Sequence, residues 1–258
     1  MKIDKNYPGL TRTEDGCYVL DGDLVSDESI EIDLDGLLTV SGNIISKQHI
    51  QAGWCIEAGG GIQAGWGIEA GGDIEVGDGI QAGCGIKAGG GIKAGGGIKA
   101  VWDIKAGVGI KAGGCIEAGG GIQAGWCIEA GGDIEVGDGI QAGCGIQAGG
   151  GIQAGGDIEV GDGIKAGCGI KAGCGIKAGW CIKAGASIEA GASIEAGDGI
   201  QAGASIESNT FIDVGLRIFA GISVFRSSEN CDKSIRCKEL RNGEIAYGDL
   251  IIVGGNKK

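Results

Sequence analysis

The side chains most capable of chemistry in this chain are its 11 cysteines. Eight of them stand at the turn positions of a repeat and none forms a C-x-x-C pair, which favours free thiols in a reducing compartment. Cys168, Cys174 and Cys181 crowd together in sequence but fall on successive turns, where they cannot converge on one metal ion. Cys231 and Cys237 are a better pair, yet no histidine lies near them. We therefore expect no metal site.

An isoleucine stands at every sixth residue from Ile50 to Ile218, 29 in succession. This repeat predicts the secondary structure that positions the cysteines. A unit of Ile-x-Ala-Gly-x-x fits no helical period. In one unit Ile92 and Ala94 face one way and Lys93 the other, as in a short strand, and the glycines can supply the positive φ of a sharp corner. Three strands complete a triangular coil of about 18 residues, and coils stack at about 4.8 Å.

The sequence therefore predicts an all-β fold, a three-sided single-chain parallel β-helix with about 18 residues per coil. The repeat leaves the handedness open. We expect an N-terminal cap and first strands in residues 1–31, the β-helix in residues 32–224 and a C-terminal cap in residues 225–258. Before the isoleucine repeat, four residues are expected to keep its register already: Leu20, Ile32, Leu38 and Ile44.

After the repeat, aromatic residues are expected to close the narrow interior. All three phenylalanines, Phe211, Phe219 and Phe225, lie close together in the sequence, and large rings over an isoleucine interior are what a terminal cap requires. The register is lost beyond Asn230, and residues 243–254 are predicted to form one or two closing strands.

The hexapeptide pattern from Ile32 to Val224 resembles that of hexapeptide-repeat β-helix proteins. The string from Asp73 to Ile80, Asp-Ile-Glu-Val-Gly-Asp-Gly-Ile, is similar to the repeats of bactofilins, which are polymer-forming bacterial β-helices. This resemblance implies a bacterial source, a structural role and assembly end to end.

Hexapeptide-repeat acyltransferases share this type of fold, but they use a histidine as general base beside an inserted loop. The chain has one histidine, His49, at the entry to the repeat, and the repeat has no insertion. A β-helix carbonic anhydrase would need three histidine ligands. No nucleophile elbow, P-loop or dinucleotide fingerprint occurs in a strand-to-helix context. We therefore expect no catalytic residues, no bound cofactor and no enzymatic activity, and we expect His49 to be a surface or capping residue.

Carboxylates offer calcium binding as another chemistry, because the string Gly-Asp-Ile-Glu-Val-Gly-Asp-Gly occurs three times. Calcium-binding repeats need their aspartates in register from coil to coil. On a coil of this length Asp73, Asp133 and Asp157 fall on three different corners, so solvated aspartates are the stronger interpretation. Three tryptophans that share one corner, Trp54, Trp126 and Trp180, are three or four coils apart and cannot form one carbohydrate-binding platform.

Residues Cys55 to Gly96 match Cys115 to Gly156 at all but three of 42 positions. The offset is ten units, which is not a multiple of three. A duplication of this size moves every copied side chain to the next face, so that no single face is kept as a functional column. This pattern favours the bulk of the β-helix or its ends, and not one of its faces, as the functional part.

Charge alternates in bands along the repeat. The stacking of coils places Glu69 beside Lys87, and Lys177 between Glu159 and Glu195, which favours a self-compensating surface. An alternative is that the bands set the register between two rods lying side by side. The chain carries a net charge of −13, and its acidic head and mildly basic tail are compatible with head-to-tail contact.

The chain has no apolar run long enough to span a membrane, and residues 1–5 lack the apolar stretch of a secretory signal. We expect a cytoplasmic protein with no membrane partner.

The first hypothesis for function is a non-enzymatic structural or scaffolding rod, which could form a homo-oligomer or filament through its coil ends or bind a protein partner. The second is an acidic inhibitor that mimics nucleic acid, and direct nucleic-acid binding is not expected. The third is a hexapeptide-type acyltransferase.

Overall fold

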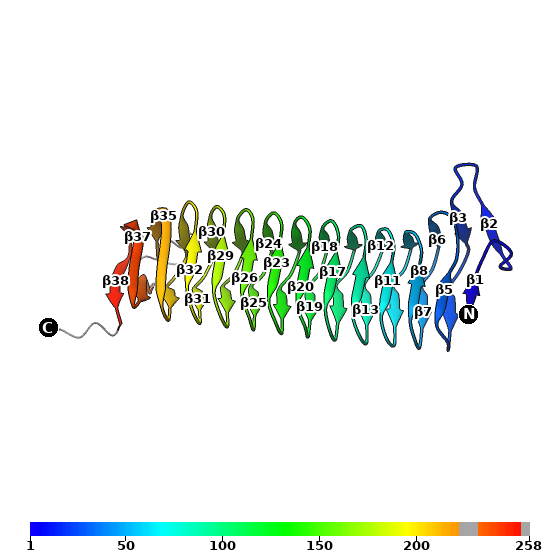
Figure 1. Ribbon diagram of the computed structural model, residues 1–258, viewed down its shortest axis with the longest axis horizontal. Helices are drawn as coiled ribbons and strands as arrows, with labels where there is room; N and C mark the ends of the chain where they lie inside the picture. The colour runs from blue at the N-terminus through cyan, green and yellow to red at the C-terminus, as the bar shows by residue number, and fades with distance from the viewer. Residues whose placement is uncertain (222–231, 254–258) are drawn as a thin grey trace. The chain divides into compact units, whose positions relative to one another are not determined.

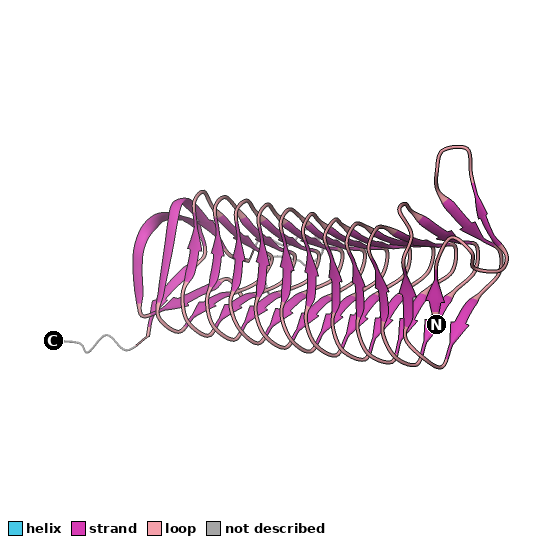
Figure 2. Cartoon of the chain, turned by 45° about the vertical axis from the view of Figure 1, so that its right-hand side comes forward, coloured by secondary structure: helices cyan, strands magenta, loops and turns pink. Residues whose placement is uncertain are grey.

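The computed structural model describes residues 1–221 and 232–253. The chain divides into two compact units, Met1–Ala130 and Gly131–Lys258, and each is described by itself. Every regular element within the described ranges is a β-strand, as Figure 2 shows. Both units have the same construction, in which short strands lie in parallel ladders on three faces.

In the first unit the strands of each face follow one another in the order of the chain, and from β3 onward every third strand lies on the same face (Figure 1). Face 1 holds β1 (Lys2–Ile3), β5 (Ile30–Ile32), β8 (Ile50–Ala52), β11 (Ile68–Ala70), β14 (Ile86–Ala88), β17 (Ile104–Ala106) and β20 (Ile122–Ala124). Face 2 holds β2 (Leu10–Arg12), β3 (Tyr18–Leu20), β6 (Leu38–Val40), β9 (Ile56–Ala58), β12 (Ile74–Val76), β15 (Ile92–Ala94), β18 (Ile110–Ala112) and β21 (Ile128–Ala130). Face 3 holds β4 (Leu24–Ser26), β7 (Ile44–Ser46), β10 (Ile62–Ala64), β13 (Ile80–Ala82), β16 (Ile98–Ala100) and β19 (Ile116–Ala118).

The second unit repeats this arrangement. One ladder contains β23 (Ile140–Ala142), β26 (Ile158–Val160), β29 (Ile176–Ala178) and β32 (Ile194–Ala196), and a second contains β24 (Ile146–Ala148), β27 (Ile164–Ala166), β30 (Ile182–Ala184) and β33 (Ile200–Ala202). Both ladders continue into the long strands β35 (Phe211–Phe219) and β37 (Glu239–Tyr247). The third ladder holds β22 (Ile134–Val136), β25 (Ile152–Ala154), β28 (Ile170–Ala172), β31 (Ile188–Ala190), β34 (Ile206–Ser208), β36 (Ser234–Cys237) and β38 (Asp249–Ile252).

Each repeat strand is short, and its first and third side chains point inward. Ile74 is fully buried and Val76 is 4% exposed, whereas Glu75 between them faces solvent. Partners in the ladder hold the same position in successive coils, as in the pairing of Ile74 with Ile92. Burying one isoleucine contributes about 1.5–3 kcal/mol, so the stacked isoleucines provide the main stabilisation. The predicted fold class is confirmed, because the chain forms an all-β, three-sided parallel β-solenoid whose coils repeat with the predicted length.

The glycines of the repeat serve a different purpose from the one predicted. None of them has a positive φ; the six described glycines that do are Gly9, Gly16, Gly22, Gly221, Gly243 and Gly248, all outside the repeat. At the fourth position of the unit, a Cβ on Gly95 would collide with the carbonyl oxygen of Gly77 in the preceding coil. Glycine stands at the corners because adjacent coils approach too closely for a side chain, and the corner needs no left-handed backbone.

The first coil is longer than the others, which corrects part of the predicted register. Leu20 pairs with Val40, and Ile32 pairs with Ala52, so the spacing between these partners is greater than in the repeat. Leu20 and Ile32 therefore occupy the third position of their strands, although the sequence pattern places them at the first. Two additional residues in the corner between β5 and β6 cause this shift. An even shift keeps the same side chains pointing inward, so the interior remains apolar.

Phenylalanine does not close the interior at the C-terminal end, so that prediction is wrong for Phe211 and Phe219. Both lie at outward positions of β35 and are half-buried, while Ile212 and Ile218 beside them are fully buried. Strand alternation places each ring opposite to its apolar neighbour. Phe225 lies outside the described residues. The interior at this end is instead followed by β36, β37 and β38.

The ten-unit duplication moves side chains between faces as predicted. Ile56 lies in β9 on face 2, and its copy Ile116 lies in β19 on face 3. Within the described residues, no helix has the length and apolar character needed to cross a membrane.

Candidate association surface at the C-terminal end

The clearest unsatisfied surface is strand β38, the last strand of the second unit. It pairs with β36 along one edge in parallel register, with Leu250 opposite Ile235 and Ile252 opposite Cys237. No described strand pairs with its other edge. All four residues of β38 are exposed, and the strand is apolar after Asp249. A flat, apolar and unpaired edge strand is a template for pairing with another chain.

The side chains of this end would be core residues if another coil followed. Ile235 and Cys237 are fully buried on β36, but Leu250 and Ile252, which stack directly on them, are 41% and 46% exposed. In β37, Leu240 and Ile245 pair with Ile212 and Ile218 and are only half-buried. Within the described residues, therefore, no further coil covers these side chains.

Four ion pairs join charged groups among the described residues of this end. The ion pairs are Lys233–Asp249 at 3.4 Å, Arg236–Glu207 at 3.1 Å, Arg217–Glu244 at 3.4 Å and Arg241–Glu239 at 3.2 Å. The guanidinium carbon of Arg241 also lies 3.4 Å from the centroid of the Phe211 ring, a cation–π contact. The described residues from 209 onward carry five acidic and five basic side chains. The predicted basic excess of the tail therefore comes from residues outside the described ranges.

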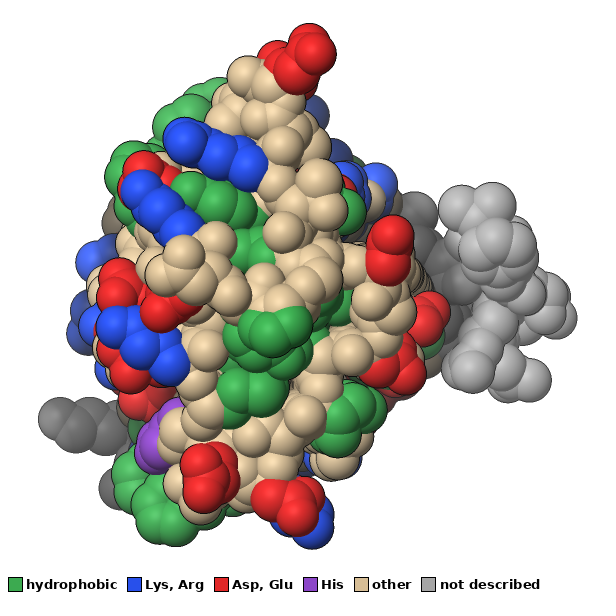
Figure 3. All heavy atoms as spheres, turned by 90° about the vertical axis from the view of Figure 1, so that its right-hand side faces the viewer, with side chains coloured by type: hydrophobic (Ala, Val, Ile, Leu, Met, Phe, Trp, Pro, Cys, Tyr) green, Lys and Arg blue, Asp and Glu red, His purple; other side chains and the backbone are tan. Residues whose placement is uncertain are grey.

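The N-terminal end of the first unit has a better covered interior, although one edge of β4 has no described partner. Strand β1 pairs with β5, and β2 forms an antiparallel hairpin with β3. The inward-facing side chains Ile3, Tyr18 and Leu24 are at most 2% exposed. Figure 3, which faces this end, shows charged side chains distributed over it rather than one apolar patch.

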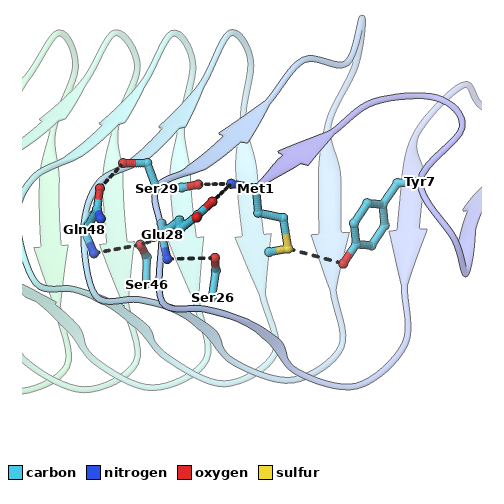
Figure 4. A network of polar contacts seen from close by, with 7 residues as sticks. All are labelled: Met1, Tyr7, Ser26, Glu28, Ser29, Ser46 and Gln48. Atoms are coloured by element: carbon cyan, nitrogen blue, oxygen red, sulfur yellow. Dashed lines mark hydrogen bonds and ion pairs between the residues drawn. The ribbon is translucent and has the colours of Figure 1, made fainter.

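Polar contacts hold the first turns of this end together (Figure 4). The amino group of Met1 donates to the carbonyl oxygen of Ser29 at 2.5 Å and lies 3.7 Å from Glu28. The Ser29 hydroxyl donates to Gln48 at 3.1 Å. The hydroxyl of Tyr7 lies 3.6 Å from the sulfur of Met1.

Asp35 is the centre of a second N-terminal cluster. It accepts hydrogen bonds from the Lys5 ammonium at 2.8 Å and from the Tyr18 hydroxyl at 2.6 Å. The Lys5 hydrogen bond, followed by that of Tyr18, lowers the pKa of Asp35 to about 2. Because Tyr18 donates to this carboxylate, its own pKa is raised. The ion pair therefore fastens the long corner over the first strands.

The sides of the first unit compensate their own charge. Glu69 pairs with Lys87 across adjacent strands, as predicted, and their charged groups are 2.7 Å apart. Lysines at the other outward positions of this band also have acidic partners, in the pairs Lys93–Glu75, Lys99–Glu117, Lys105–Asp103 and Lys111–Glu129. In the second unit Lys177 lies between Glu159 and Glu195 in the ladder, again as predicted. These pairs favour the self-compensating surface over register-setting bands.

His49 occupies a structural position on face 1. Its Nδ1 accepts the backbone N–H of Gly67 at 3.2 Å, and its ring lies 5.3 Å from the ring of Trp66. It borders a shallow groove of about 500 Å³ along the outward side chains of this face, including Glu69 and Lys87. The groove is open and already crossed by the Glu69–Lys87 ion pair, so it offers no enclosed position for a substrate.

None of the described cysteines takes part in a disulfide bond. Cys168 and Cys174 are exposed and Cys181 is partly exposed. Cys237 is buried, and this burial raises the pKa of its thiol; Cys231, its predicted partner, lies outside the described residues. No group of three or more metal-binding side chains occurs in residues 1–221 and 232–253.

A set of hydrogen-bond acceptors was not predicted from the sequence. Asp73, Asp133 and Asp157 each accept the backbone N–H of the glycine that follows one coil later, at 2.5, 2.6 and 2.7 Å. Asn43 and Asp103 make the same contact at 2.8 Å. These side chains stand directly before the isoleucine, at the sixth position of the unit. A polar residue there, followed by glycine at the same position of the next coil, is the signal that would have identified them.

The chain matches no protein-family model, and comparisons with curated proteins and with solved structures gave no significant match.

Proposed function

We propose that this protein is a non-enzymatic structural or scaffolding protein that self-associates through the end of its solenoid. The observation that carries this proposal is the exposed edge of β38 above an uncovered apolar interior. Its sides carry ion pairs, with exposed tryptophans such as Trp66 and Trp126 at the corners, whereas β38 exposes consecutive apolar side chains together with an unpaired backbone edge. An interaction at the end would therefore bury the surface that water solvates least well.

Hydrolase or transferase chemistry receives less support from the geometry. Nδ1 of His49 is engaged by a backbone N–H, and its neighbours in the groove are ion-paired side chains. Mimicry of nucleic acid receives less support as well, because the lysines of the first unit interrupt the acidic surface. The described cysteines, which form no disulfide bond, support a reducing compartment, and we propose the cytoplasm.

Light scattering combined with negative-stain imaging over a range of concentrations tests this proposal. We expect the average mass of the wild-type protein to rise with concentration, with end-joined particles in the images. A mass that stays at 25.6 kDa up to millimolar concentration would contradict self-association. Assays for acyl transfer and hydrolysis are expected to show no turnover, and reproducible turnover would contradict the non-enzymatic role.

A further inference from the structure

The backbone of β38 shows which of its groups are free for a partner. The N–H of Asp249 donates to the carbonyl of Lys233 at 3.0 Å, and the N–H of Val253 donates to the carbonyl of Cys237 at 2.8 Å. Successive residues of a strand direct their N–H and C=O groups to opposite edges. The N–H and C=O groups of Leu250 and Ile252 therefore point to the open edge.

The side chains of β38 restrict how a second strand can align with it. Leu250 and Ile252 continue the inward-facing columns of Ile235 and Cys237, while Ile251 continues the outward column of Arg236. Opposed residues in a sheet share one face. When the partner is a second, antiparallel β38, this rule requires the two-fold axis to pass through a residue and not between two residues.

A two-fold axis through Ile251 keeps opposed residues on the same face and also pairs the free backbone groups of Leu250 and Ile252. It places Leu250 opposite Ile252 of the second copy, and Ile252 opposite Leu250 of the second copy, as hydrogen-bonded pairs. Each pair exchanges two N–H···O bonds, so all four outward-pointing N–H groups and their carbonyls in the two strands are used. Ile251 then faces Ile251 of the second copy as a non-hydrogen-bonded pair, with Cα atoms about 4.5 Å apart.

We propose that two copies of this chain join through their C-terminal ends as a closed, two-fold symmetric dimer centred on Ile251. This inference rests on the proposed function and names the partner of the same surface. A second copy fits this edge because it supplies the same apolar strand and because the described charges at this end balance within each copy. The contact also continues the ladder of β34, β36 and β38 across the axis.

The proposed contact uses the C-terminal end alone. At the N-terminal end one edge of β4 has no described partner and Leu10 is half-buried, but the inward-facing side chains Ile3, Tyr18 and Leu24 are buried. A two-fold contact uses the same patch on both subunits and is closed once it forms. Because the contact occupies the C-terminal edge of both copies, its product is a dimer.

Substitution of Ile251 tests the dimer because this outward side chain is 41% exposed and outside the core. Ile251→Lys and Ile251→Glu each place like charges opposite each other across the axis. We expect each variant alone to raise the dimer dissociation constant at least about tenfold, because it adds the like-charge repulsion and also removes the burial of Ile251 in both copies; sedimentation equilibrium measures this change. An equimolar mixture is expected to recover a dimer with one copy of each variant, identified by native mass spectrometry.

Val25→Lys is the matched control, because Val25 is the middle, outward residue of β4, a strand with one unpaired edge at the N-terminal end, and is 58% exposed. It is expected to leave the dissociation constant unchanged. A loss of association in Val25→Lys, or no recovery in the mixture of Ile251 variants, would overturn the two-fold arrangement in favour of head-to-tail stacking.

The association of the wild type and of the Ile251 variants distinguishes an error in the two-fold arrangement from an error in the proposed function. If the wild type associates while both Ile251 variants associate equally well, the surface assignment is wrong and self-association stands. If the wild type remains monomeric, the proposed function itself fails. Circular dichroism spectra identical to that of the wild type establish that the variants are folded before either result is interpreted.

Discussion

At the scale of single residues, the repeat is determined by the absence of side chains as much as by their presence. From Gly53 to Gly203 the fourth position of the unit is glycine with one departure, Val101. A Cβ on Gly95 would collide with the carbonyl oxygen of Gly77 in the preceding coil. This close approach of adjacent coils explains why glycine recurs there.

Gly95→Ala is expected to lower the free energy of unfolding by about 1–3 kcal/mol, the usual cost of inserting a methyl group into a packed site. Gly53→Ala is the control, because a Cβ at Gly53 meets no atom within 4 Å. It is expected to be neutral or to stabilise by about 0.4–1 kcal/mol. Urea denaturation followed by circular dichroism measures both, and equal effects of the two changes would contradict the steric explanation.

Asp35 predicts the acid response of the N-terminal end. Its pKa in the folded chain is about 2, below its ordinary value of 3.8, so its charged form stabilises the fold above pH 4. This contribution decreases as the pH falls below about 4 and is lost only below about 2, the folded pKa. The difference in urea midpoint between the wild type and Asp35→Asn should be constant from pH 7 to 5 and decrease steeply between about pH 4 and about pH 2. A difference that stays constant from pH 5 down to pH 2 would show that the carboxylate charge is not responsible.

At the scale of elements, three-residue strands are too short to be stable alone and depend on their neighbours in the ladder. The sixth position of the unit adds a hydrogen bond between coils to those of the backbone ladder. The backbone N–H at this position donates to a side chain at the same position of the preceding coil, where that side chain is an acceptor. The Oδ1 of Asp133 provides this acceptor for Gly151. Asn43 does the same for Gly61, so the contact needs an acceptor and not a charge.

Asp133→Ala is therefore expected to lower the free energy of unfolding by about 0.5–1.5 kcal/mol, the net value of one hydrogen bond. Asp133→Asn retains an acceptor of the same shape and should remain within about 0.5 kcal/mol of the wild type. Hydrogen exchange at the Gly151 amide reports the contact directly. Faster exchange in the asparagine variant than in the alanine variant would be inconsistent with this role.

At the scale of the whole molecule, each unit separates a buried interior from an exposed surface. The cysteines report this separation, since Cys168 and Cys174 are exposed at corners while Cys237 is buried in β36. Burial also raises the pKa of the Cys237 thiol, which reduces its reactive thiolate fraction.

Alkylation of the native protein at pH 8 is therefore expected to modify Cys168 and Cys174 at least about tenfold faster than Cys237. Peptide mass spectrometry after short labelling times measures the three rates in one experiment. Unfolding in urea should make the rates equal. Rapid native labelling of Cys237 would mean that β37 and β38 do not cover β36 in solution.

The sequence alone determined the coil, because an isoleucine at every sixth residue permits only one way to bury these side chains. It also determined the ladder partners, such as Glu69 with Lys87, since three six-residue units per coil place them side by side. The sequence pattern could not locate Leu20 and Ile32, because an even shift of register preserves the same apolar alternation. The sequence holds the signal for the hydrogen bond that Asp73 accepts, but the distance between coils, which only the structure supplies, is needed to recognise it.

The tertiary structure decided which end of the chain is available. Residues 243–254 were predicted from sequence to be closing strands, and β37 and β38 do lie there. Whether Leu250 and Ile252 are covered depends on whether another coil lies beyond them, and nothing in their own sequence encodes this. An apolar strand has the same pattern in a core as at an edge. Only the stacked coils show that Ile3, Tyr18 and Leu24 are covered at the N-terminal end and that β38 is exposed with one unpaired edge.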